Sequence, residues 1–211
     1  MKIILGSASK RRQQLLKEWG FKFDVKIPDI DEKQFRSDDV QNLPLEISKA
    51  KSEHLKKQIR EPAILVTCDT VVVHDGQLYE KPKAAEDARR MLSSYGDKPV
   101  EVICGVVVVN TATGKTFQGL DNSKVYFYKV PQTLIEEMIL LGKIFDYAGA
   151  FHIDDPPIKP YIAFIEGEPE TVMGLPKFLT QKLCKNLRKL TKFYAGYVRL
   201  RRLCNITEVY T

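Results

Sequence analysis

The sequence lacks several patterns that would assign it to common classes of protein. Its four cysteines form no CxxC pair, which argues against a structural zinc site, and the three histidines show no metal-ligand spacing. No apolar run approaches the roughly 18 residues of a membrane helix, so no membrane partner is expected. The short apolar start at residues 1–6 predicts a first strand rather than a signal peptide, and a cytoplasmic location is the default expectation.

Two familiar catalytic motifs are also absent. There is no Walker-type glycine-rich loop and no GxSxG nucleophile elbow. These absences argue against P-loop nucleotide chemistry and against a serine nucleophile. They favour water as the nucleophile, activated by a metal ion and a carboxylate. The cysteines are expected to be small buried apolar residues without a chemical role.

The net charge of +6 is unevenly distributed along the chain. Residues 171–205 contain nine Lys or Arg and no acid, whereas residues 1–170 carry 24 basic and 26 acidic residues. A basic stretch can bind nucleic acid or acidic lipid, but it is more typical of a solvated helix face. Nucleic acid is therefore not expected as a partner.

Hydrophobic periodicity alternates between the strand and helix periods along the chain. This interleaving predicts an α/β fold with an elongated, mixed and partly parallel β-sheet flanked by helices. No linker divides the chain into independent domains, although two lobes around one long sheet are compatible with the pattern. Strands are predicted at 2–5, 21–27, 63–73, 101–110, 115–129, 147–153 and 162–166, and helices at 9–19, 45–60, 84–95, 131–141 and 175–191.

The first candidate site is the turn from Gly6 to Arg12, between a predicted strand and a predicted helix. Backbone N–H groups and the positive helix end would point to one place there. The hydroxyls of Ser7 and Ser9 add donors, and Arg11 and Arg12 add planar cations suited to phosphate oxygens. The alternative is a serine N-cap followed by two solvated arginines.

The second candidate is Asp69, at the end of a strongly apolar stretch. A carboxylate in or beside a buried strand is costly unless it is paired or bound to metal. In open α/β sheets ligands sit near strand ends, so Asp69 suits a magnesium ligand or a general base for water. The alternative is an aspartate held by backbone donors in a turn.

Two loop segments offer further charged groups. Lys81, followed by Pro82, could neutralise charge on a transferred phosphoryl group. Glu32 ends the acidic loop 29–32 and could complete a metal site with Asp69. The alternatives are an ordinary Lys-Pro loop and a solvated turn.

The candidate site segments resemble those of the Maf family, and the resemblance runs from residue 1 to about residue 190. It implies a Maf-like nucleotide pyrophosphatase domain over 1–190 and a basic C-terminal extension over 191–211. The matching blocks are a Ser-x-Ser-x-Arg-Arg turn (Ser7, Ser9, Arg11, Arg12), Glu32, Lys49-Ala50, Asp69–Val72 with Gly76 and Lys81-Pro82, Ala148–Phe151, and Gly174–Pro176. The family has proline where this chain has Lys10.

The resemblance implies a hydrolase of acid anhydrides that splits nucleoside triphosphates between the α and β phosphates. The products are a nucleoside monophosphate and pyrophosphate, in a house-cleaning role on modified or non-standard nucleotides. It further implies Mg²⁺ or another divalent metal such as Mn²⁺, a homodimer, and a substrate cleft between two lobes similar to the inosine triphosphatase fold. Asp69 would be the general base or a metal ligand, and Glu32 would help hold the metal. The triphosphate would be held by Ser7, Arg11, Arg12, Lys49 and Lys81.

The base preference remains open between two branches of the family. The branch that resembles dTTP and UTP pyrophosphatases has lysine and glutamine where this chain has Tyr147 and Asp154, whereas the 7-methyl-GTP branch has a non-lysine and an acid. The segment Asp69–Val72, however, is more similar to the dTTP/UTP branch. An aspartate could accept from N1 and N2 of a cationic methylated guanine while an aromatic ring faces the charge. Alternatively, Tyr147 and Asp154 only pack or face solvent.

A second class of function is a nucleotide- or RNA-binding module without turnover, with the basic extension as its contact surface. Asp69, Glu32 and Lys81 argue against it, because a binding module would not need that combination of groups.

Overall fold

The computed structural model describes residues 1–35 and 39–187, and its centre is a seven-stranded sheet in the order β2-β1-β3-β5-β6-β7, with β4 paired to β3. Strand β1 runs parallel to β2 and β3, and the remaining pairs are antiparallel. The predicted mixed, partly parallel sheet is therefore confirmed. The strands are β1 (Lys2–Gly6), β2 (Phe23–Val25), β3 (Ala63–His74), β4 (Gln77–Leu78), β5 (Val100–Asn110), β6 (Thr116–Phe127) and β7 (Ile162–Glu166).

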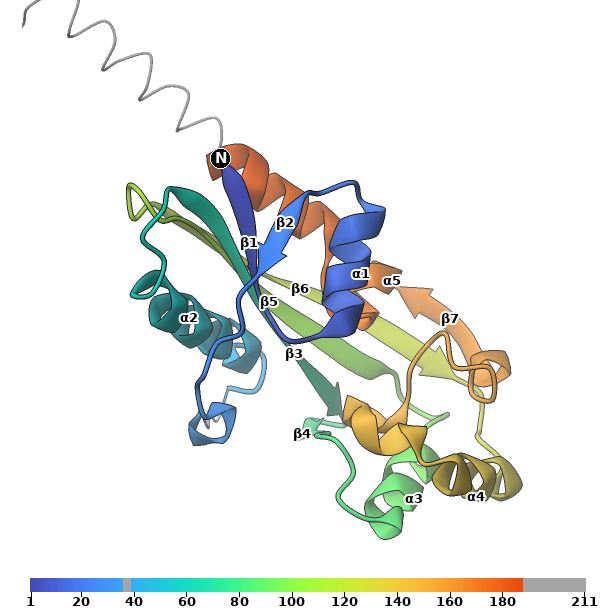
Figure 1. The fold of residues 1–211 in the computed structure, drawn as a ribbon. Coiled ribbons are helices and arrows are strands. Elements are labelled where there is room, and N and C mark those ends of the chain that lie inside the picture. Colours follow the sequence, from blue (N-terminus) through green and yellow to red (C-terminus); the bar gives the residue numbers. More distant parts are fainter. Residues whose placement is uncertain (36–38, 188–211) are drawn as a thin grey trace, which may run out of the picture.

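Helices flank this elongated sheet, as the periodicity predicts. Figure 1 shows α1 and α2 beside the β1 end of the long strands, with α3 and α4 at the other end. The last predicted helix is present over 177–187, and its remainder lies outside the described residues, as does the predicted domain boundary at 190. The others are α1 (Lys10–Glu18), α2 (Leu43–Lys56), α3 (Ala85–Ser93), α4 (Gln132–Leu141) and the short α5 (Pro169–Val172).

Strand β3 is buried on both faces, and its side chains alternate between two packing environments. Ile64, Val66 and Cys68 pack in a cluster with residues of α1 and of the 177–187 helix. Further along the strand, the odd-numbered residues Val71 and Val73 pack with residues of α2 on the opposite face. This alternation places odd-numbered residues of β3, Asp69 among them, on the α2 face.

Gly105 in β5 allows α2 to lie unusually close to the sheet. It pairs with Asp69 across the ladder, and a Cβ atom at Gly105 would lie only 2.3 Å from the backbone nitrogen of Leu45. The Ser48 hydroxyl also donates to the Gly105 carbonyl at 2.7 Å. Because only glycine fits there, the start of α2 sits directly above the strand pair that carries Asp69.

The predicted strand at 147–153 is wrong. The structure has a short 3₁₀ turn at Ala148–Ala150, with positive φ angles at Gly149 (70°) and Ala150 (60°). The Tyr95 hydroxyl donates to the Gly149 carbonyl at 2.6 Å and anchors this turn against α3. The apolar pattern that suggested a strand instead reflects burial of Ala150, Phe151 and Ile153 in the cluster around α3 and α4.

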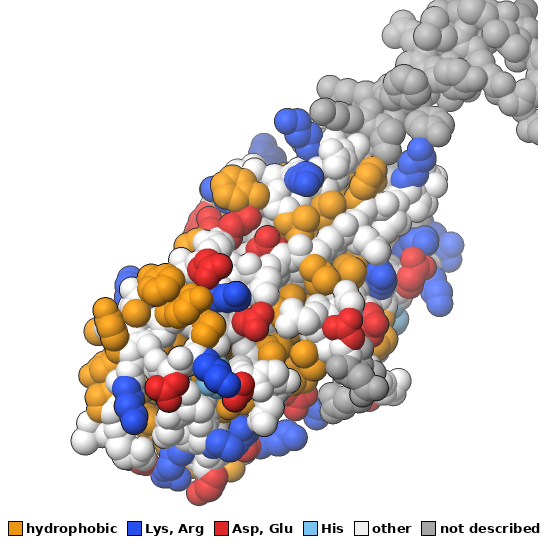
Figure 2. Space-filling view, turned by 180° about the vertical axis from the view of Figure 1, so that it is seen from behind, with side chains coloured by type: hydrophobic (Ala, Val, Ile, Leu, Met, Phe, Trp, Pro, Cys, Tyr) orange, Lys and Arg blue, Asp and Glu red, His pale blue; other side chains and the backbone are white. Residues whose placement is uncertain are grey.

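No helix in the described ranges is long and apolar enough to cross a membrane. Cys68, Cys104 and Cys184 are buried, which agrees with their expected packing role, and Cys204 lies outside the described residues. On the face shown in Figure 2, basic and acidic side chains are interspersed and hydrophobic side chains gather between them.

Candidate active site

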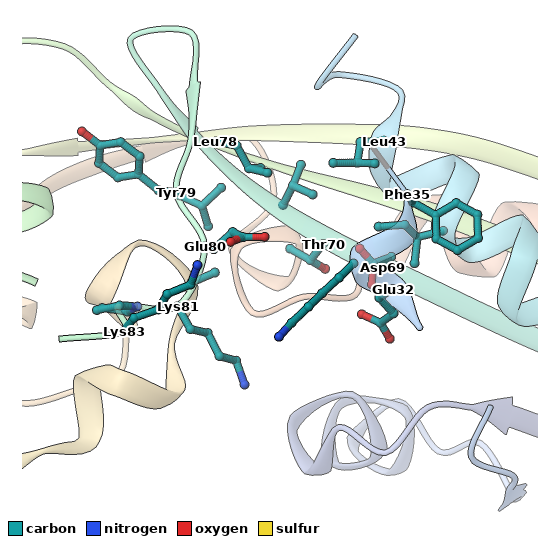
Figure 3. Close-up of a pocket in the computed structure, with 16 residues that line it drawn as sticks. Glu32, Phe35, Leu43, Asp69, Thr70, Leu78, Tyr79, Glu80, Lys81 and Lys83 are labelled. Carbon is teal, nitrogen blue, oxygen red and sulfur yellow. The ribbon is translucent and has the colours of Figure 1, made fainter. Parts of the chain in front are cut away.

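A cavity of about 460 Å³ opens beside β3, between α2 and the segment that follows β4. Figure 3 shows Asp69 and Glu32 on one side of this pocket, with Lys81 and Lys83 on the facing side. Both predicted carboxylates and the predicted lysine therefore line one pocket. The lining residues are Glu32, Lys33, Phe35, Leu43, Ile47, Asp69–Val72, Leu78–Lys83 and Ala148.

Lys51 links two of the acidic residues that line the pocket, Asp69 and Glu32. Its Nζ lies 2.6 Å from Asp69 Oδ1 and 2.8 Å from Glu32 Oε1. Lys51 and Asp69 are 4% and 7% exposed, whereas Glu32 is exposed at the pocket mouth. Burying an aspartate is costly without a partner, and the Lys51 ammonium supplies one. The cluster thus keeps a buried carboxylate in place at the pocket wall.

Sequence reasoning selected Lys49 and missed Lys51. The structure places Lys49 on the exposed side of α2, away from the residues that line the pocket. Residues four apart share a helix face, and Lys51 lies four residues from both Ile47 and Leu55, which are buried. A lysine in register with those apolar positions was the available signal, because Lys49 is two residues off that face.

Arg12 lies against the edge of β3 just beyond the end of β1. The β1–β3 ladder ends at the Gly6–Thr67 pair, and Arg12 then donates from Nη1 to the Cys68 carbonyl at 2.8 Å. It also donates to the Gly174 carbonyl at 2.8 Å, the Thr70 hydroxyl at 2.9 Å and Ser7 Oγ at 3.4 Å. Four of its five N–H groups are therefore used within the protein. Arg12 pins the Ser7 turn beside the backbone that flanks Asp69.

The two serines of the turn have different roles. Ser7 is buried, and its hydroxyl accepts from the Ser9 amide and from Arg12. Ser9 is the N-cap of α1, because its hydroxyl accepts from the Arg12 amide at 3.3 Å. The N-cap alternative therefore describes Ser9, and the cap also orients the first turn of α1 toward β3.

Arg11 and Asp154, predicted as two separate substrate contacts, contact each other. Arg11 Nη2 lies 2.6 Å from Asp154 Oδ2. Tyr147 lies near the same segment, with its ring 5.2 Å from that of His152. Burial, and then the Arg11 charge, lower the pKa of His152, while burial and Asp155 raise the pKa of Tyr147. Neither Tyr147 nor Asp154 lines the pocket described above.

The pocket can be tested for its fit to a divalent metal by its donor set. Within the described chain, no group of three or more His, Cys, Asp or Glu side chains is placed to hold a metal ion. Mg²⁺ is usually bound by one or two carboxylates and otherwise by water and substrate phosphates. Asp69 and Glu32 meet that need, because Lys51 contacts one oxygen of each. The donor set therefore fits a magnesium ion that takes two ligands from these carboxylates and the remaining ligands from water and a phosphate substrate.

Taken together, fold and site define an α/β protein with a serine–arginine turn beside a buried lysine–carboxylate cluster. The model of the family described as Maf-like protein matches residues 2–187, and the chain belongs to this family. A 7-methyl-GTP pyrophosphatase of Dictyostelium discoideum is 38% identical, covering 86% of this chain and 94% of that protein. A dTTP/UTP pyrophosphatase of Vibrio vulnificus (strain YJ016) is 35% identical, covering 86% of this chain and 96% of that protein.

Among solved structures, the chain aligns with a nucleoside-triphosphatase / dITP/XTP pyrophosphatase from Mycobacterium abscessus. The TM-score is 0.42 at 11% identity, covering 92% of this chain and 97% of that one. A similarity at this level does not identify functional residues in this chain.

Proposed function

We propose that this protein is a nucleoside triphosphate pyrophosphatase, which cleaves the α–β phosphate bond to yield a nucleoside monophosphate and pyrophosphate. The observation that carries the proposal is the Lys51 cluster, in which one buried ammonium binds Asp69 and Glu32 at the wall of an open pocket. The activities named for the relatives from Dictyostelium and Vibrio support the same reaction class.

Asp69 is the proposed general base for the attacking water. Its Oδ1 is held by Lys51, whereas Oδ2 makes no hydrogen bond with any described residue. That arrangement leaves one carboxylate oxygen to accept a proton in the pocket while the other is fixed. Lys81 lines the opposite side and is proposed to neutralise charge on the phosphates.

Asp69 and Glu32 are the residues that would hold Mg²⁺ or Mn²⁺. When bound, such an ion supplies Lewis-acid stabilisation of negative charge on phosphate oxygens. Lys51 has a separate task, because its positive charge keeps two neighbouring carboxylates from repelling each other. Ser7 and the first turn of α1 are proposed to contribute donors to the triphosphate, as helix N-termini do for anions.

The test is turnover of a nucleotide panel by the purified full chain with Mg²⁺, followed by chromatographic identification of products. Equimolar nucleoside monophosphate and pyrophosphate support the proposal, while nucleoside diphosphate and orthophosphate contradict it. Binding without any product would instead favour a nucleotide-binding module. The panel contains 7-methyl-GTP, UTP, dTTP and the common triphosphates.

The panel also addresses the base. The names of the relatives divide between 7-methyl-GTP and dTTP/UTP. If Asp154 and Tyr147 recognise a cationic base, 7-methyl-GTP should be the better substrate. A preference for dTTP and UTP of more than about tenfold, or about 1.4 kcal/mol, would exclude that interpretation.

A homodimer and a cytoplasmic location are further parts of the proposal. They rest on the family resemblance. Light scattering coupled to size-exclusion chromatography measures the oligomer directly, and cell fractionation tests the location.

A further inference from the structure

The ion pair between Arg11 and Asp154 has an unusual setting. Arg11 Nη2 is 2.6 Å from Asp154 Oδ2 and 2.7 Å from Met173 Sδ. Arg11 Nε is buried and has no hydrogen-bond partner among the described residues. The Arg11 side chain is 25% exposed, compared with 47% for the Asp154 side chain. Asp154 is thus the charged group that fixes the direction of the Arg11 guanidinium.

The two partners belong to different parts of the core. Arg11 lies in the first turn of α1, whose Leu15 and Leu16 pack in the cluster beneath β1 and β3. Asp154 directly follows Ile153, which packs in the cluster around α3 and α4. The pair therefore joins two segments that pack in different core clusters.

Arg11 and Arg12 approach the same short turn after α5. Arg12 Nε donates to the Gly174 carbonyl, while Arg11 Nη2 contacts the adjacent Met173. Arg12 uses most of its donors within the protein, as described above. Arg11 Nη2 is used by Asp154 and Met173 and Nε is buried, so the two Nη1 donors remain for an anion at the turn.

A base-reading role suits Asp154 poorly in this arrangement. Its charge is compensated by Arg11, which weakens its attraction for a cationic base. We infer that Asp154 is instead a positioning residue, which holds Arg11 in place for the triphosphate whatever base the nucleotide carries. The inference rests on the proposed function, since it assigns Arg11 to the phosphates of that substrate.

The experiment measures the dissociation constant of inorganic triphosphate, which has no base, by calorimetry on the full chain. Asp154→Asn should weaken triphosphate binding about three- to tenfold, as expected for loss of a partly exposed charged partner. It should lower kcat/KM for 7-methyl-GTP and UTP by the same factor. Asp155→Asn, which removes the same charge one residue along, should leave both measurements unchanged.

A double-mutant cycle separates positioning from direct contact. In an Arg11→Gln background, Asp154→Asn should change triphosphate affinity less than about twofold. Unchanged triphosphate affinity with a shifted ratio of 7-methyl-GTP to UTP turnover would overturn the inference in favour of base reading. Tighter triphosphate binding by Asp154→Asn would also overturn it, because the carboxylate would then compete with phosphate.

Failure of the proposed function is visible separately. If the wild-type chain releases no pyrophosphate from any nucleotide, the enzymatic proposal fails, whereas the triphosphate titration still decides whether Asp154 acts through Arg11.

Discussion

The Lys51 ammonium lies 2.6 Å from Asp69 Oδ1, and both side chains are buried at the junction of α2 and β3. Replacing Lys51 with methionine leaves Asp69 buried without its partner. Loss of one member of a buried pair costs about 3 to 5 kcal/mol, so Lys51→Met should lower the free energy of unfolding by roughly that amount. Turnover should be lost as well.

Lys49→Met is the matched control, because it removes the same charge from the exposed side of the same helix. Chemical denaturation and product release should leave Lys49→Met close to wild type. If instead Lys49→Met abolishes turnover and Lys51→Met does not, the assignment of the lysine at this site is wrong.

Asp69→Asn keeps the shape of the side chain but removes its capacity to accept a proton. General-base catalysis typically contributes about 10²- to 10⁴-fold, so kcat should fall by at least about 10²-fold. Asp75→Asn, at the exposed turn beyond the same strand, is the control and should retain full activity. Asp69→Ala is expected to be inactive too, and full turnover in either Asp69 variant would refute the role of this residue.

Glu32→Gln should raise the Mg²⁺ concentration that activity requires more than it lowers the rate of the chemical step. Glu32 is exposed at the pocket mouth, and Asp69 remains as a partner for the buried Lys51, so the substitution removes a carboxylate ligand without leaving a buried charge unpaired. The Mg²⁺ concentration for half-maximal activity should rise about tenfold or more. Chelation by EDTA should stop the wild-type reaction, and added Mg²⁺ should restore it. Asp29→Asn, in the same loop, should respond to Mg²⁺ as wild type does; an equal rise in both variants would point to general electrostatics.

His152 should make stability depend on pH in the mildly acidic range. Burial, and then the nearby Arg11, hold the pKa of His152 below its ordinary value, while Asp154 and Asp155 act in the opposite sense. The Asp154 amide also donates to His152 Nδ1, which requires that nitrogen to be unprotonated. The unfolded chain therefore binds the proton more readily, and stability falls as the pH drops below about 6.5.

His152→Gln should flatten this pH dependence. Urea denaturation at a series of pH values between about 5 and 7.5 gives the slope. The variant should lose less stability than wild type on acidification, and His54→Gln, on the outer part of α2, is the comparison. Equal slopes for wild type and His152→Gln would contradict the assignment.

Gly105→Ala should destabilise the fold strongly. The new Cβ would lie 2.3 to 2.5 Å from backbone atoms of Leu45 and Pro44. Backbone atoms in a helix cannot move away as the end of a flexible side chain can. Overpacking of this kind costs about 1 to 3 kcal/mol or more. Gly119→Ala is the control, because its nearest neighbour at 2.9 Å is a flexible end of Leu179. Thermal unfolding of both variants measures the difference.

Sequence patterns predicted most of the secondary structure, because long apolar strands and amphipathic helices have distinct periods. They predicted Asp69, Glu32 and Lys81 in one site because their chemistry is complementary. They could not predict that the 147–153 segment turns, since its apolar residues are equally suited to a strand. Nor could they pair Arg11 with Asp154, because a contact between residues so distant in sequence depends on packing of the whole fold.

Arg12 binds carbonyl groups 56 and 162 residues further along the chain, at Cys68 and Gly174. Such contacts form only when the beginning, middle and end of the domain are all folded. The turn from Gly6 to Arg12, which we propose binds the triphosphate, is therefore formed only in the folded chain, and a ligand that binds there would bind only the native state. By mass action, a saturating triphosphate raises the melting temperature of the entire domain, which makes a simple thermal-shift measurement a sensor of occupancy at this turn.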